Sequence, residues 1–429
     1  MGMKAYPAYK ESDTPWLGKI PAYWEMIQYR AYFTERKEPN FNLQEKNLLS
    51  LSYGRIIKKD INKSEGLTPG SYATYNIIEE GDIVLRLTDL QNDHKSLRTA
   101  LCTQRGIITS AYVTLRPLHC NVNSSYFQYQ LHVFDVRKSI YGVGGGVRQT
   151  LNYDAIVRLK ACVPPAEEQQ AIVAYLDKKC AEIEELISRR QAIIERLKEL
   201  KQSIIAETVT KGLNPETPMK ESGLAWMPKV PEHWRIERLQ WHLREVKVGN
   251  SPIKTNQVLS LTNKKGVIPY EEKGNQGNKA KESLSEYKLA YPNTLVMNSM
   301  NVIIGSVGIS NYFGCVSPVY YIFKTLGDSS LAYINYIFQT TIFQKELRRY
   351  ANGILEIRLR LSVNNILKRP VPIPSIEEQK AIVSYLDKKC SEIDALISRH
   401  EQTIEKLKEL KTATIADVVT GKVDVRKSI

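Results

Sequence analysis

The segment EEQQAIVAYLDKKCAEIEELISRRQAIIERLKELKQSIIAETVT, from Glu167 to Thr210, decides the organisation of the chain because it occurs twice. It returns as EEQKAIVSYLDKKCSEIDALISRHEQTIEKLKELKTATIADVVT from Glu377 to Thr420, displaced by 210 residues, without a gap and with about two thirds of its positions identical. Self-similarity at one long, fixed period indicates a chain built from two copies of one unit.

Each copy has the pattern of a single long helix. Leu176, Ile183 and Leu197 belong to a row of apolar residues spaced by seven, a second apolar row is offset from it, and charged residues take nearly all other positions. About 45 residues at 1.5 Å each form a helix of roughly 65 Å. A small domain cannot cover so long and narrow an apolar face, so we expect the two helices to pack together as an antiparallel coiled coil. The residues expected between them are Leu176, Ile183, Leu186, Leu197, Leu386, Ile393, Leu396 and Leu407.

The repeat continues outside the helices. Trp24 and Leu151 have counterparts, Trp234 and Leu361, that lie 210 residues further along the chain. The chain is therefore predicted to be a pseudo-twofold tandem repeat, in which each copy is a globular domain followed by a long helix. The predicted parts are residues 1–165 and 213–375 for the two globular domains, 166–212 for the first helix, and 376–429 for the second helix with the C-terminal tail.

The globular parts show mixed local signals. Short runs rich in Val, Ile, Leu and Tyr are bounded by Gly, Asn, Pro and Asp, which predicts strands. Residues 331–349 have helical spacing with apolar residues on one side. The uncharged run 292–323 is interrupted by Asn, Ser and Gly, so it indicates buried strands and turns rather than a membrane-spanning helix. Each globular domain is predicted to be α+β, with helices against a twisted, partly closed sheet.

The composition points to a polyanionic partner. The chain contains 60 Lys and Arg against 46 Asp and Glu, a net charge of +14 with a pI near 9.2. This balance favours nucleic acid over a membrane surface, although a merely basic protein would share it. The six cysteines form no CxxC or Cys/His cluster, and the first residues contain no apolar signal segment. A reducing, cytoplasmic setting is therefore expected.

Motifs for catalysis are missing from the sequence. No GxxxxGK[ST] phosphate loop occurs, and the glycine run 142–146 follows no strong βα unit. The two ExK sequences, at 199–201 and 409–411, lie on charged helix faces where surface ion pairs are expected. The six histidines show no metal-ligand spacing. We therefore expect a chain that is non-catalytic and binds neither a metal nor a cofactor.

The repeated motifs resemble the specificity subunit of type I restriction-modification systems. They are KES-x-x-x-W-x-x-x-x-P-x-x-W at the start of each half, R-x-x-L after a glycine-containing segment, and P-x-x-x-EQ-x-A-I-V at the start of each long helix. The resemblance covers nearly the whole chain twice, with Asp13 where the second copy has Gly223. It implies two target recognition domains that each read one half of a bipartite, asymmetric DNA site, and helices that space them. It further implies two methyltransferase subunits that bind S-adenosylmethionine, and restriction/motor subunits.

The differences between the two copies predict where DNA is read. Domains that read different half-sites should share their framework and differ in the loops that contact bases, where Arg, Lys, Asn and Gln can make bidentate base contacts. Arg148 and Arg358, which are common to both copies, fit phosphate contacts better. A solvated loop charge is the alternative for each residue. The candidates are Arg55, Lys58, Lys59, Lys63, Arg86, Asn92, Lys95, Arg98, Arg105, Arg148, Lys264, Lys265, Lys273, Asn275, Gln276, Asn298, Asn301 and Arg358.

Two further expectations concern geometry and class. The symmetry of the repeat predicts that residues 1–15 lie beside residues 421–429. A helix of roughly 65 Å would place the half-sites one to two duplex turns apart. A coiled-coil adaptor that binds protein partners is the rival function, and salt-dependent, sequence-selective DNA binding with a methyltransferase would separate the two.

Overall fold

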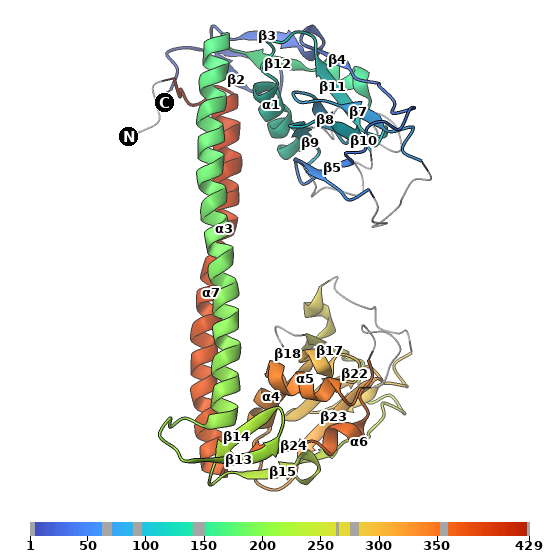
Figure 1. Ribbon diagram of the computed structural model, residues 1–429, viewed down its shortest axis with the longest axis vertical. Helices are drawn as coiled ribbons and strands as arrows, with labels where there is room; N and C mark the ends of the chain where they lie inside the picture. Colours follow the sequence, from blue (N-terminus) through green and yellow to red (C-terminus); the bar gives the residue numbers. More distant parts are fainter. Residues whose placement is uncertain are drawn as a thin grey trace. The chain divides into compact units, whose positions relative to one another are not determined.

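The computed structural model describes residues 5–61, 71–88, 97–139, 151–262, 266–274, 283–351 and 359–426. The chain forms two compact units. Unit 1 comprises Met1–Arg190 with Gln402–Ile429, and unit 2 comprises Gln191–Glu401. Each long helix, α3 (Ala166–Lys211) and α7 (Ile376–Val419), therefore contributes to both units (Figure 1).

Unit 1 is built on a four-stranded antiparallel sheet in the order β4-β11-β8-β9, with two-stranded sheets around it. The strands of the main sheet are β4 (Phe33–Glu35), β8 (Ile83–Leu85), β9 (Thr99–Leu101) and β11 (Val113–Pro117). The paired strands are β1 (Tyr9–Glu11) with β2 (Lys19–Pro21), β3 (Glu25–Gln28) with β12 (Lys160–Val163), β5 (Leu49–Ser52) with β6 (Arg55–Lys58), and β7 (Asn76–Ile78) with β10 (Gly106–Ile108). The helices are α1 (Ser124–Val136) and α2 (Tyr153–Val157).

Unit 2 repeats this plan, with the sheet order β16-β23-β20-β21. The strands of its main sheet are β16 (Leu243–Glu245), β20 (Thr294–Asn298), β21 (Val307–Ser310) and β23 (Tyr320–Thr325). The paired strands are β13 (Met219–Leu224) with β14 (Met227–Pro231), β15 (Arg235–Arg238) with β24 (Pro370–Ile373), β17 (Leu259–Thr262) with β18 (Gly266–Pro269), and β19 (Lys288–Ala290) with β22 (Gly314–Val316). The helices are α4 (Leu331–Gln339), α5 (Thr341–Arg348) and α6 (Val363–Leu367), with a 3-10 turn, η5, at Val302–Ile304.

The long helices are antiparallel within each unit. In unit 1 the first part of α3 packs against the last part of α7, and Lys411 forms an ion pair with Glu184. In unit 2 the last part of α3 packs against the first part of α7, and Lys201 lies 2.7 Å from Asp394. These ion pairs occupy equivalent positions of the repeat. The main core of each unit includes residues of both helices, so the predicted class, two similar α+β units joined by two long antiparallel helices, is confirmed.

The packing between the helices differs in one respect from the prediction. Leu186 and Leu396 were expected between the helices, but they are 45% and 41% exposed. The buried row instead contains Cys180 and Ile194, which are 9% and 6% exposed. The sequence has adjacent apolar residues at 186–187 and at 193–194. Counting in alternating steps of three and four from Cys180, as in a coiled coil, places the second residue of each pair against the partner helix. Leu176, Ile183, Leu386 and Ile393 are buried, and Leu197 and Leu407 are half-buried.

The predicted helix at 331–349 is broken in the structure. Thr340, which is fully buried, ends α4 by donating its hydroxyl to the Ile337 carbonyl at 2.8 Å. The same hydroxyl accepts from the Phe343 backbone N–H and so caps α5. The run 292–323 folds into short strands and turns, as predicted. In the parts of the chain that the structure describes, no helix is both long and apolar enough to cross a bilayer.

Candidate nucleic-acid interface

The same tyrosines attach each globular part to its helix. In unit 1 the Tyr126 hydroxyl donates to the Cys162 carbonyl at 2.8 Å, and the Tyr129 hydroxyl donates to Asp177 of α3 at 2.7 Å. In unit 2 the corresponding hydroxyl of Tyr336 donates to Asp387 of α7. Burial is the main reason that the pKa of each of these tyrosines is raised, so they stay protonated donors. The framework that carries the candidate readers is thus the same in both units.

The start of α3 holds the two ends of the described chain together. The hydroxyls of Tyr6 and Tyr23 donate to Glu168 at 2.7 and 2.9 Å, and the guanidinium of Arg426 lies over both rings. The Tyr9 hydroxyl approaches the Lys422 carbonyl at 3.5 Å. The predicted proximity of the two ends is therefore confirmed for the described residues (Figure 1).

The same arrangement recurs in unit 2, where the linker after α3 replaces the chain end. His233 lies 2.9 Å from Glu378, which is the counterpart of Glu168. Gly212 has a positive φ of 79° and lies against the Trp234 ring, as Gly421 lies against Trp24 in unit 1. Both glycines end a long helix where the chain must turn closely past a buried tryptophan.

Several candidate DNA-binding residues are exposed, but two of them are engaged in ion pairs. Lys58 and Lys59 are exposed at the end of β6 and just after it. Arg55 lies 2.5 Å from Glu184 of α3, so its guanidinium is directed to the helix. Arg105 pairs with Glu45 and Glu79. Lys273 is half-buried, with its ammonium 5.0 Å from the centre of the Tyr270 ring.

Other candidates serve the framework. Arg98 is fully buried, and its guanidinium donates to the carbonyls of Arg86 and Thr88, at 2.7 Å for the latter. A buried guanidinium that supports the backbone cannot reach a base edge, so the prediction for Arg98 is wrong. Arg86 is half-buried and its backbone N–H pairs with the Arg98 carbonyl.

In unit 2, two asparagines of the predicted reading segment shape a turn. Asn298, which is 9% exposed, accepts the backbone N–H of Met300, and Asn301 precedes η5 and is half-buried. The remaining candidates lie outside the described residues: Lys63, Asn92, Lys95, Arg148, Lys264, Lys265, Asn275, Gln276 and Arg358.

A cationic surface that sequence reasoning missed lies on α5. Lys345 and Arg348 are exposed on this helix and Arg349 is exposed at its C-cap, whereas Phe343 and Leu347 are buried beneath it. The sequence pattern predicts helical spacing over residues 331–349 and does not single out the basic residues near its end. The adjacent threonines at 340–341, followed by a basic run, were the available signal.

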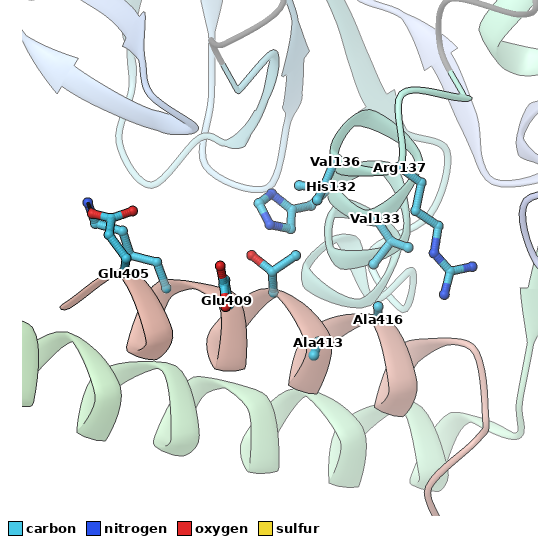
Figure 2. A pocket seen from close by; sticks show the side chains of 10 residues that line it. His132, Val133, Val136, Arg137, Glu405, Glu409, Ala413 and Ala416 are labelled. Atoms are coloured by element: carbon cyan, nitrogen blue, oxygen red, sulfur yellow. Dashed lines mark hydrogen bonds and ion pairs between the residues drawn. The ribbon is translucent and has the colours of Figure 1, made fainter. Parts of the chain in front are cut away.

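The cavity shown in Figure 2 lies in unit 1 between α1 and α7 and measures about 380 Å³. Val133, Val136, Ala413 and Ala416 line its apolar part, while Glu405 and Glu409 stand at one side. Burial and the nearby Lys411 lower the pKa of His132, which also faces the cavity, to about 4. The described residues contain no group of three His, Cys, Asp or Glu that could hold a metal.

Comparison with known proteins agrees with this geometry. No family model matches the sequence. The chain is 23% identical over 381 residues to the type I restriction enzyme MjaVIII specificity subunit of Methanocaldococcus jannaschii, covering 82% of this chain and 81% of that protein. It is 22% identical over 329 residues to the protein named putative type I restriction enzyme MjaX specificity subunit of the same organism, covering 73% of this chain and 71% of that protein.

The fold has a close counterpart among solved structures. A chain from a structure of complex assembly and conformational transition in the type I restriction-modification system shares the fold with a TM-score of 0.66 and 15% identity, covering 93% of this chain and 98% of that one. The chain thus shares with that chain a fold of two α+β units linked by two long helices. It is a homologue of the type I restriction enzyme specificity subunits, which confirms the resemblance inferred from its motifs.

Proposed function

We propose that this protein is the DNA-specificity subunit of a type I restriction-modification complex, in which each unit reads one half of a bipartite, asymmetric DNA site. The observation that carries the proposal is a duplicated framework with unlike surfaces. Equivalent tyrosines and acidic residues attach both globular parts to the helices, whereas the segments that follow the shared strands differ between units. Two globular parts that are attached to the helices in the same way but differ in their surfaces suit a two-part DNA target that is not palindromic. The net charge of +14 supports a polyanionic ligand.

The long helices act as spacers in this proposal. They contain 46 and 44 residues, which correspond to roughly 65–70 Å each. A duplex turn measures about 34 Å, so we expect half-sites that are one to two turns apart and separated by a nonspecific gap of several base pairs.

The exposed apolar residues of the helices are the proposed docking points for two methyltransferase subunits. Leu186 and Leu396 occupy equivalent positions of the repeat and are 45% and 41% exposed. Leu200 and Leu410 are likewise equivalent, with 49% and 53% exposed. An identical partner that binds twice requires the same surface twice, and apolar side chains at the centre of an interface contribute most when they become buried.

The chain itself is proposed to be non-catalytic and to act in the cytoplasm, where its DNA target lies. The methyltransferase subunits would bind S-adenosylmethionine, and restriction/motor subunits would join for cleavage. The test is to express the protein with its methyltransferase subunit and to map methylated bases across the genome. Methylation at one bipartite, asymmetric sequence is expected. A complex that forms but methylates without sequence preference would refute the DNA-specificity role and favour a coiled-coil adaptor.

A further inference from the structure

We propose that the hairpin of β5 and β6 is the part of unit 1 that enters the DNA groove, with Tyr53 at its tip against the base edges and Lys58 on a phosphate. This inference rests on the proposed function and deepens it, because it names the side chains of unit 1 that would read and hold the DNA.

The first support is the conformation of the hairpin turn. The strand register pairs Ser52 with Arg55, so Tyr53 and Gly54 alone form the turn. Their φ angles are 45° and 77°, and positive values at both central residues are typical of a type I′ turn, in which Asn-Gly or Gly-Gly is preferred. A tyrosine is sterically disfavoured at a positive φ, where glycine is not. Strained residues of this kind cluster at functional sites, so we expect the Tyr53 side chain to have a role outside the turn.

The second support is that the body of the hairpin is packed while its tip is open. Leu49 and Leu51 of β5 are buried in the core of unit 1. The turn rests on Leu97, because a Cβ on Gly54 would lie 3.1 Å from the Leu97 Cβ atom. Tyr53, in contrast, is 77% exposed. An aromatic side chain offers a large contact area and loses little conformational entropy when it becomes buried against a ligand.

The third support is an ion-pair connection between the hairpin and the long helices. The guanidinium of Arg55, the first residue of β6, lies 2.5 Å from the carboxylate of Glu184 in α3. The same carboxylate forms an ion pair with Lys411 of α7. One acidic residue of unit 1 therefore joins the hairpin to both helices. Since these helices are the proposed spacers, a hairpin tied to them would keep a defined position along the DNA.

The fourth support is the charge of the hairpin. Residues 53–60 contain three cations and one carboxylate, Asp60. Two of the cations, Lys58 and Lys59, are exposed. The Lys59 backbone N–H donates to the Leu48 carbonyl at 2.8 Å, so the two-stranded ribbon extends to these lysines. The major groove of DNA is wide enough for such a ribbon, and lysines at its base can reach the phosphates along the groove.

The experiment uses the full complex with the methyltransferase subunit and measures its affinity for target, single-mismatch and nonspecific duplexes over a range of salt concentrations. For Tyr53→Gly, which keeps a residue suited to the turn, we expect discrimination at one base pair of a single half-site to fall about 5- to 20-fold. The slope of log K against log salt should stay unchanged in this variant. For Lys58→Ala we expect the slope to fall in magnitude by about 1, with a similar loss of affinity for target and nonspecific duplexes. Lys10→Ala, at an exposed lysine of β1 in the same unit, is the matched control and should change neither quantity.

The outcomes separate this inference from the function on which it rests. A wild-type complex without sequence-selective binding would overturn the proposed function. Selective binding by the wild-type complex, together with wild-type discrimination in Tyr53→Gly, would overturn only the assignment of the tip. A Tyr53→Gly variant that loses the methyltransferase subunit but keeps its discrimination would overturn that assignment as well, because the tip would then dock a protein. A wild-type salt slope in Lys58→Ala would overturn the phosphate contact. Thermal unfolding checks the fold, and Tyr53→Gly is expected to unfold within about 3 °C of the wild-type protein.

Discussion

Removing seven residues from both long helices tests the spacer role directly. Residues 188–194 and 398–404 are equivalent in the repeat, and each segment lies between the residues that form the interhelical ion pairs. A heptad deletion keeps the seam of each helix facing its partner. Each helix shortens by about 10 Å, and a base pair occupies about 3.4 Å of duplex. The nonspecific gap of the methylated target is therefore expected to shorten by about three base pairs, with both half-sites unchanged.

Methylation mapping of cells that express the deletion variant with its methyltransferase subunit provides the measurement. Deleting 188–194 alone is the control, because the pairs Lys411–Glu184 and Lys201–Asp394 could not both form once the helices differ in length. We expect that control to lose stability and methylation. Methylation by the double deletion at the original gap, with the original half-sites, would refute the reasoning, since the helices would then not set the distance.

Three other predictions concern the framework. Ile183→Ala, at a residue 7% exposed, should lower the free energy of unfolding by about 2–4 kcal/mol. Leu186→Ala should lower the free energy of unfolding by about 0.5 kcal/mol but weaken methyltransferase binding in pull-down titrations. Equal losses of stability would contradict the assignment of Ile183, rather than Leu186, to the interface between the helices. The folded protein keeps His132 neutral down to a pKa of about 4, whereas the unfolded chain takes up a proton near pH 6.5. The contribution of the neutral imidazole to stability is therefore fully present above pH 6.5 and is lost as the pH falls towards 4. Denaturant titrations should show that His132→Asn removes up to about 2 kcal/mol of the stability difference between pH 7 and pH 5; an unchanged difference would count against a buried neutral histidine. A circular permutant opened at Leu213, with the present ends joined, should fold and support methylation because Tyr9 and Lys422 are already in contact; a permutant that fails to fold would argue against this closure.

The repeated hexapeptide DVRKSI shows that local sequence alone does not determine the structural role of a residue. At 135–140 its aspartate lies in the last turn of α1, is fully buried and accepts the Arg98 backbone N–H. At 424–429 its aspartate lies beyond α7 and binds the guanidinium of Arg426. The described residues of the two copies differ in structure because each copy meets different neighbours, and the repeat of the hexapeptide has no structural explanation.

The sequence by itself determined the architecture. A period of 210 residues, two apolar heptad patterns and proline-flanked helix starts are local or translational signals, so they predicted two α+β units and two long paired helices without knowledge of any contact. The same signals predicted that residues 1–15 would lie beside residues 421–429, because the repeat is symmetric.

Only the tertiary structure decided which of two neighbouring apolar residues faces the partner helix, that Arg98 supports a buried backbone, and that Thr340 splits one predicted helix into two. Each of these depends on atoms brought together from distant parts of the chain. Whether a side chain is buried and whether its polar atoms are hydrogen-bonded depend on the atoms around it in the folded protein. The neighbouring residues in the sequence do not determine either property.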